Sequence, residues 1–72
     1  MAPPLISGRA CIRALGKVGY VWVRTRGSHA RLEAPGRAPV TVPLHDVLDR
    51  GTLRNIVATA GLTLDEFVAL LD

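Results

Sequence analysis

The sequence feature that most constrains the fold is a run of strand-forming residues interrupted by a tight turn. Residues 20–26 alternate between two sets of side chains and are rich in β-branched and aromatic types, which is typical of a β-strand. Gly27 and Ser28 then suit a two-residue hairpin turn, and the alternation resumes over residues 29–34. We therefore predict an antiparallel hairpin whose two faces differ in chemical character.

A two-residue turn also predicts which side chains face each other across the hairpin. The open face would carry Tyr20 and three facing pairs, which are Arg26 with His29, Arg24 with Arg31, and Trp22 with Glu33. The core face would carry Val21, Val23 and Thr25, with Val23 packed against Leu32. This register gathers arginine, histidine and aromatic side chains on one surface.

Helical patterns lie on both sides of the strand region. Ser7 is a suitable N-cap for a helix over residues 7–18, with Gly19 as its C-terminal stop. Asp49 can cap a second helix, which Gly61 ends and whose apolar stripe consists of Leu53, Ile56, Val57 and Ala60. Thr63 and Glu66 form a capping box, which predicts the start of a last short helix.

The strands and helices combine into one α+β domain. Residues 39–43 predict a third strand with Val40 and Val42 turned inward, and its prolines suit a sheet edge. The order is then helix, three strands, helix and short helix, with the helices on one face of a three-stranded antiparallel sheet. Seventy-two residues suffice for one domain, which we assign to residues 7–72. We expect residues 1–6, which include two prolines, to form a flexible lead.

Charge and composition narrow the function. Nine Lys and Arg residues against six Asp and Glu residues give a net charge of +3, which favours polyanionic partners. Cys11 is the only cysteine, and two histidines without ligand spacing do not make a zinc site, so we expect neither metal nor cofactor. No stretch approaches the ~20 apolar residues of a membrane span, and the N-terminus lacks the regions of a signal peptide. We expect a cytoplasmic protein without membrane contact.

The open face of the hairpin combines groups that can act on a phosphodiester. Like charges facing each other destabilise a sheet, so the Arg24–Arg31 pair favours a bound anion, and phosphate suits guanidinium groups. The alternative is that the register differs by one residue, or that Glu33 and water compensate the charge. An imidazole exchanges protons near neutral pH, and RNA supplies its own nucleophile in the 2′-hydroxyl.

We therefore identify His29 as a candidate general base or acid, and Arg24, Arg26 and Arg31 as candidate phosphate ligands. Ser28 is a further candidate for substrate contact, beside its role in the turn. On residue chemistry alone, however, a histidine after a hairpin turn is more often an ordinary surface residue.

Several segments together resemble the HicA toxins over nearly the whole chain. They are Ser7-Gly-Arg, Gly19-Tyr-Val-Trp-Val-Arg24, Arg26-Gly-Ser-His29, Val40-Thr-Val-Pro-Leu-His45, Gly51-Thr-Leu-Arg-Asn-Ile56 and Ala60-Gly-Leu. The resemblance implies a fold similar to the double-stranded-RNA-binding domain, ribonuclease activity on mRNA, and a HicB-like antitoxin that blocks the active site. The catalytic histidine of the family maps onto His29.

The chain departs from the family pattern in one place. Many relatives carry a second histidine at the position of Ala30, which should point to the core, so we expect catalysis to be intact. Arg24 is the one candidate arginine at a position that the family commonly keeps basic, and the role of His45 is open. Two alternatives stand beside the ribonuclease hypothesis. One is a non-catalytic RNA- or protein-binding module, and the other is a toxin that survives only as the ligand of its antitoxin.

Overall fold

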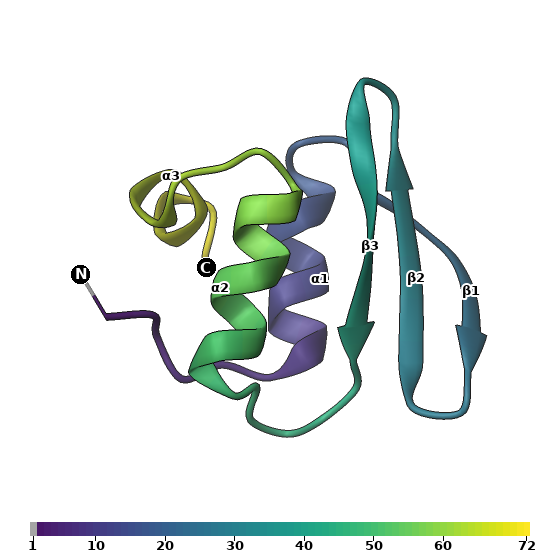
Figure 1. The fold of residues 1–72 in the computed structure, drawn as a ribbon, viewed down its shortest axis with the longest axis horizontal. Helices are drawn as coiled ribbons and strands as arrows, with labels where there is room; N and C mark the ends of the chain where they lie inside the picture. The colour runs from purple at the N-terminus through teal and green to yellow at the C-terminus, as the bar shows by residue number, and fades with distance from the viewer. Residues whose placement is uncertain (1) are drawn as a thin grey trace.

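Three antiparallel strands and three helices make up the part of the chain that the computed structural model describes, residues 2–72. The elements are α1 (Gly8–Gly16), β1 (Val21–Arg26), β2 (His29–Ala34), β3 (Arg37–Pro43), α2 (Arg50–Thr59) and α3 (Leu64–Ala69). The sheet order is β1-β2-β3, so that β3 with its prolines lies at an edge, as expected. Figure 1 shows α1 and α2 packed beside β3, whereas β1 lies at the far edge of the sheet. The α+β architecture predicted from the sequence is confirmed.

The core lies between the two long helices and the β2–β3 part of the sheet. Its largest fully buried side chains come from every layer and are Phe67, Leu15, Leu32, Leu48, Leu53, Val42 and Cys11. The inward faces expected for the third strand and for the stripe of α2 are confirmed, since Val40, Val42, Leu53 and Ile56 are buried. A period of two in strands and of 3.6 in helices is sufficient to identify these positions.

All three predicted N-caps are present. The side chains of Ser7 and Asp49 each accept a hydrogen bond from the backbone amide three residues further on, at 3.0 and 3.2 Å. Thr63 and Glu66 form the complete capping box, with bonds of 3.1 and 2.8 Å. The backbone amide of Thr63, which donates to Glu66, lowers the pKa of that carboxyl. Helix α1 ends at Gly16, two residues earlier than predicted, and β3 begins two residues earlier, at Arg37.

A β-bulge changes the predicted register of the hairpin beyond Arg24. The pairing shifts between Trp22 and Arg24, so Trp22 lies opposite Leu32 rather than Glu33. Because Leu32 is buried toward the helices, the prediction that Trp22 lies on the open face is wrong. One extra residue in a strand reverses the side-chain alternation. The Trp22 ring has the Arg9 guanidinium 5.5 Å from its centroid, and its Nε1 donates to Thr25 Oγ1 at 2.7 Å.

Two further predictions about this part of the chain are wrong. Every residue of β1 is exposed, with Val21 at 61% and Val23 at 47%, so these valines do not pack into the core and Val23 does not meet Leu32. Tyr20, expected on the open face, is instead buried, and its hydroxyl donates to the carbonyl of Ala38 at 2.7 Å. The apolar alternation of this strand therefore marks strand propensity and not burial.

The N-terminal lead, from Pro3 onward, makes contacts with the domain. Pro3 is buried and its carbonyl accepts a hydrogen bond from Arg50 Nε at 3.2 Å. The carbonyl of Ile6 accepts another from the amide of Leu48 at 2.7 Å. Met1 lies outside the described residues.

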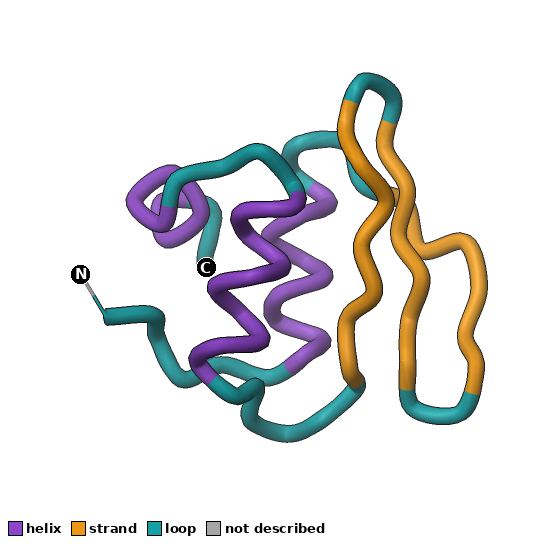
Figure 2. Tube along the Cα trace, viewed as in Figure 1, coloured by secondary structure: helices purple, strands orange, loops and turns teal. Residues whose placement is uncertain are grey.

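Backbone hydrogen bonds connect the start of α1 to the hairpin turn. The amide of Gly8 donates to the carbonyl of His45 at 3.0 Å, and the amide of Leu44 donates to the carbonyl of Ser28 at 2.6 Å. The β1–β2 turn, the β3–α2 loop and the start of α1 lie together at one end of the molecule (Figure 2). The loop after β3 is thereby held between the helix and the turn.

This connection requires glycine at position 8. A Cβ there would lie 2.0 Å from the carbonyl oxygen of Pro43, whereas a Cβ at Gly16 would meet nothing within 4 Å. We predict that Gly8→Ala lowers the free energy of unfolding by at least about 2 kcal/mol, because backbone must move to admit the methyl group. Gly16→Ala should be neutral or stabilising by up to about 1 kcal/mol. Urea denaturation of both variants checks this, and equal stabilities would contradict it.

Cys11 offers a second test of the core. Burial raises the pKa of its thiol from 9.0 to about 12. The thiolate is the reactive form, so we predict that iodoacetamide at pH 8 labels the native protein at least about 100-fold more slowly than the urea-unfolded chain. Because the folded-state pKa is the higher one, Cys11 favours the folded state below pH 9, and this contribution is lost between pH 9 and 12. Equal labelling rates in both states would show an accessible thiol.

Candidate active site

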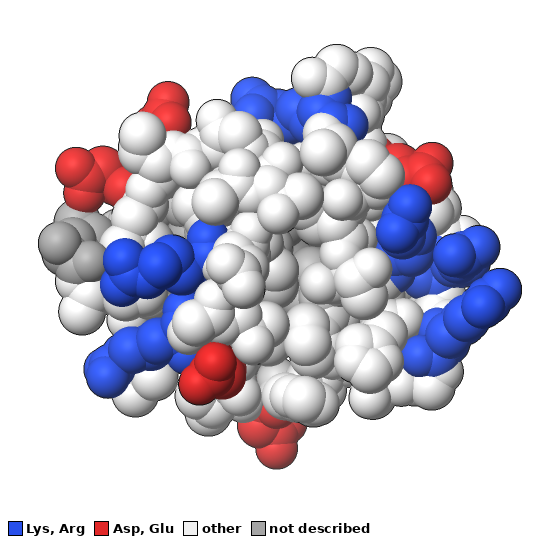
Figure 3. Space-filling model, viewed as in Figure 1, with Lys and Arg blue, Asp and Glu red and all other residues white. Residues whose placement is uncertain are grey.

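The candidate site is a small hollow on the open face of the sheet. It has a volume of about 90 Å³ and is lined by Arg24, Arg26, His29, Arg31 and Thr41. All three strands contribute, with β2 in the centre. In Figure 3, Lys and Arg side chains gather on the side of the molecule where β1 and β2 lie. Four of the five predicted site residues are thus brought together.

The facing pairs nearest the turn are as predicted. Arg26 pairs with His29, and Arg24 pairs with Arg31, so two guanidinium groups stand opposite each other on adjacent strands. The turn explains this register, because of its two residues Gly27 takes a positive φ, of 55°, and Ser28 does not, as a hairpin turn with glycine in first place requires. Both pairs lie on the turn side of the bulge and are therefore unaffected by it.

Arg31 has unused hydrogen-bonding capacity at the centre of this hollow. Its Nε is shielded from solvent and has no hydrogen-bond partner within the described residues. The carboxylate of Glu33 lies 3.9 Å away, which is an ion-pair distance but too long for a hydrogen bond. A shielded N–H donor with no partner costs free energy, and a turn of the Arg31 side chain toward an anion in the hollow would relieve this cost. The geometry therefore favours phosphate binding.

His29 is an exposed residue held on both sides by backbone pairing. It begins β2, pairs with Arg26 on β1 and with Pro43 on β3, and follows the turn whose carbonyl is bound by Leu44. The imidazole is therefore placed by the sheet beside three guanidinium groups, and water or a ligand can reach it. Such a side chain can accept a proton from, or donate one to, a bound phosphodiester.

The residues that line the hollow differ from the sequence prediction at two positions. Ser28 does not line the hollow; its carbonyl binds the loop after β3. Thr41, which the sequence analysis missed, does line it, because Thr41 pairs with Arg31 across β2 and β3. The signal was available, since Thr41 separates the inward-facing Val40 and Val42 and must point to the open face.

Two other features bear on what this part of the chain can do. Within residues 2–72, no three His, Cys, Asp or Glu side chains are grouped so that they could hold a metal ion. In the same range, no helix has the length and apolar character needed to cross a bilayer. The functional groups that line the hollow are three guanidinium groups, one imidazole and one hydroxyl.

Fold and site together define a class, a small α+β domain that presents a histidine among arginines at a β-hairpin turn. Comparison with known proteins agrees with this description. A chain from a toxin–antitoxin complex of Streptococcus pneumoniae is 33% identical and superposes with a TM-score of 0.70, covering 79% of this chain and 98% of that chain. A search of curated proteins finds no match.

The match to a protein-family model decides to which family the chain belongs. The model described as HicA toxin of bacterial toxin–antitoxin matches residues 8–62, a range that contains the whole hollow. The chain belongs to the HicA toxin family, as the resemblance indicated, and is a toxin of a toxin–antitoxin system.

The arginine pair predicts a measurable cost in the unliganded protein. Like charges opposite each other on adjacent strands destabilise a sheet, so Arg24→Gln should raise the free energy of unfolding by about 0.2–1 kcal/mol at low ionic strength. The gain should disappear near 1 M NaCl, where the Debye length is about 3 Å. Arg54→Gln removes the same charge from an exposed site on α2 and should have a smaller effect. If both variants gain equally, net charge and not the facing pair is the cause.

Proposed function

We propose that this toxin is an endoribonuclease that cleaves mRNA without a metal ion, with His29 as its acid–base residue. The observation that carries the proposal is the hollow in which an exposed imidazole lies among three arginines from two adjacent strands. The membership in a toxin family supports it, because cleavage of mRNA is an effective way to stop growth. The site of action would be the cytoplasm, where mRNA is found.

The chemistry needs few groups from the protein. The 2′-oxygen of a ribose attacks the adjacent phosphorus while the His29 imidazole removes the 2′-hydroxyl proton. A new bond forms between phosphorus and the 2′-oxygen, and the bond from phosphorus to the 5′-oxygen of the next nucleotide breaks. The products are a 2′,3′-cyclic phosphate and a 5′-hydroxyl end, whose proton comes from the imidazolium or from water. Because the RNA contains both nucleophile and electrophile, an open surface site is sufficient.

The arginines would act on the phosphate oxygens. Negative charge builds on the two non-bridging oxygens during attack, and guanidinium N–H groups can bind both. Arg24 and Arg31 face each other, so their mutual repulsion in the free protein is relieved as the charge forms. Arg31, whose Nε has no partner in the free protein, would gain a hydrogen bond if its side chain turned toward the phosphate. The site would therefore bind the transition state more strongly than the ground state.

The partner would be a HicB-like antitoxin that covers this face. The relative from Streptococcus pneumoniae lies in a toxin–antitoxin complex. Near the hollow, β1 exposes Val21 and Val23 at 61 and 47%, and exposed apolar groups near a charged site are typical of protein interfaces. An acidic segment of the antitoxin could pair with the arginines and hide His29, so inhibition would be occlusion of the site.

A second candidate function is RNA binding without cleavage. The same basic face would hold RNA equally well if His29 had no role in proton transfer. Incubation of the purified toxin with a long single-stranded RNA separates the two functions. Shortened products with cyclic phosphate ends support the ribonuclease, whereas retained but intact RNA supports the binding module.

The catalytic assignment predicts different effects for the two histidines. Removal of an acid–base group costs about 10²- to 10⁴-fold in rate, so His29→Ala should lower RNA cleavage by at least about 100-fold and abolish growth inhibition on expression. His45→Ala should stay within about twofold of the parent, since His45 does not line the hollow and its carbonyl is retained. Circular dichroism should show both variants folded. A His29→Ala variant as toxic as the parent would falsify the assignment.

A further inference from the structure

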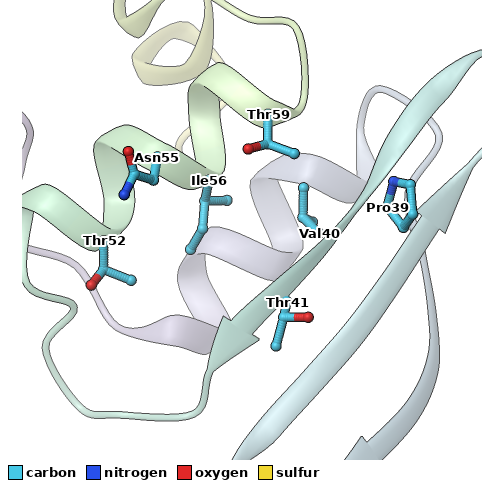
Figure 4. Close-up of a pocket in the computed structure, with 7 residues that line it drawn as sticks. All are labelled: Pro39, Val40, Thr41, Thr52, Asn55, Ile56 and Thr59. Atoms are coloured by element: carbon cyan, nitrogen blue, oxygen red, sulfur yellow. The ribbon is translucent and has the colours of Figure 1, made fainter.

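A second, larger depression lies on the other side of β3, between that strand and α2. It has a volume of about 260 Å³ and is lined by Pro39, Val40, Thr41, Thr52, Asn55, Ile56 and Thr59. Figure 4 shows the threonine and asparagine side chains of α2 along one wall, with Ile56 and Val40 between the helix and the strand. Nothing in the ribonuclease proposal uses this groove.

The groove adjoins the His29 hollow at one residue. Thr41 lines both depressions, because it lies on the edge strand and pairs with Arg31 in the sheet. Pro43, which pairs with His29, lies two residues beyond Thr41 on β3, a separation of about 7 Å along the strand. A strand of RNA bound in the hollow could therefore reach the groove by crossing β3 at Thr41.

The lining of the groove differs from that of the hollow in charge. All seven lining residues are uncharged, and the surface between α2 and β3 is free of Lys, Arg, Asp and Glu in Figure 3. The floor is apolar, since Val40 and Ile56 are buried, and the rim carries three hydroxyls and one carboxamide. Within residues 2–72, the one side-chain hydrogen bond of these rim groups joins Thr52 Oγ1 to Asp49 Oδ2 at 3.5 Å. The other polar groups are free to bind a ligand.

This combination fits a nucleobase better than a phosphate. A base has an apolar ring face and an edge of hydrogen-bond donors and acceptors, and single-stranded RNA is recognised through unstacked bases of this kind. The volume is below the range of about 300–1,000 Å³ that drug-sized ligands occupy, as expected for one base. Phosphate, by contrast, needs cationic groups, which line the hollow and not the groove.

We propose that the groove between α2 and β3 is a nucleobase-binding subsite for the nucleotide next to the phosphodiester held at His29, and that Asn55 reads the edge of the base. The inference rests on the proposed ribonuclease function and extends it from cleavage to base preference. A carboxamide presents a donor and an acceptor side by side, which is the pattern that distinguishes one base from another. Thr41 connects the two subsites.

The first test is binding, measured on the His29→Ala protein so that RNA stays intact. A short single-stranded RNA that contains all four bases is titrated into ¹⁵N-labelled protein, and inorganic phosphate is titrated in parallel. The amides of Thr52, Asn55 and Thr59 should shift with RNA and not with phosphate, whereas Arg31 should shift with both. No RNA-induced shift on α2, or equal shifts with phosphate, would overturn the proposal.

The second test is base preference at the cleaved bond. It is measured by sequencing the ends of RNA cleaved by the parent toxin and by variants that retain His29. A good side-chain contact to a base edge changes discrimination by about 5- to 150-fold. Asn55→Ala should therefore reduce the preference at one position beside the cleaved bond by about tenfold, and Asn55→Asp should change which base is preferred. Arg54→Gln, on the neighbouring residue of α2 outside the groove, should leave the preference unaltered.

The outcomes separate this inference from the proposed function. If the parent toxin cleaves RNA and Asn55→Ala leaves every base preference unchanged, the groove proposal fails and the ribonuclease stands. If the parent cleaves nothing, yet RNA shifts the amides of α2, the ribonuclease fails and the groove stands. If Asn55→Ala weakens only antitoxin binding, the groove belongs to a protein interface and the proposal is overturned.

Discussion

The rest of the structure depends on how little of the sheet its helices can cover. A chain of 72 residues has two helices long enough to pack on the sheet, and both lie against the β3 side. Strand β1 is therefore exposed along its whole length. The face of the sheet turned away from the helices is open as well, so water solvates the arginines that cluster on it and large ligands can reach them.

The site combines a rigid support with an unfavourable arrangement of charge. The turn that precedes His29 is bound by Leu44, and the next residue of that loop, His45, is bound by Gly8 at the start of α1. This support holds Arg24 opposite Arg31 although the two repel each other. Such a cost in stability is common where a protein is arranged for a ligand that is absent. The basic hollow and the neutral groove then divide the surface into two chemically different parts that meet at Thr41.

The sequence by itself determined the elements and the part of the site close to the turn. Caps at Ser7, Asp49 and Thr63 depend on residues three apart, and alternation within a strand depends on neighbours, so both can be predicted locally. The Arg26–His29 and Arg24–Arg31 pairs follow from a two-residue turn, because short loops transmit register without ambiguity.

Only the tertiary structure decided what lies farther from the turn. The bulge at Val23 places Trp22 toward the helices and leaves Val21, which pairs with Glu33, exposed on the other face. Thr41 joins the hollow, and Asn55 the groove, through contacts between segments distant in sequence. Local patterns specify how side chains alternate along a segment. Which face of the segment meets a neighbour depends on non-local packing, and one extra residue in a strand is enough to change that face.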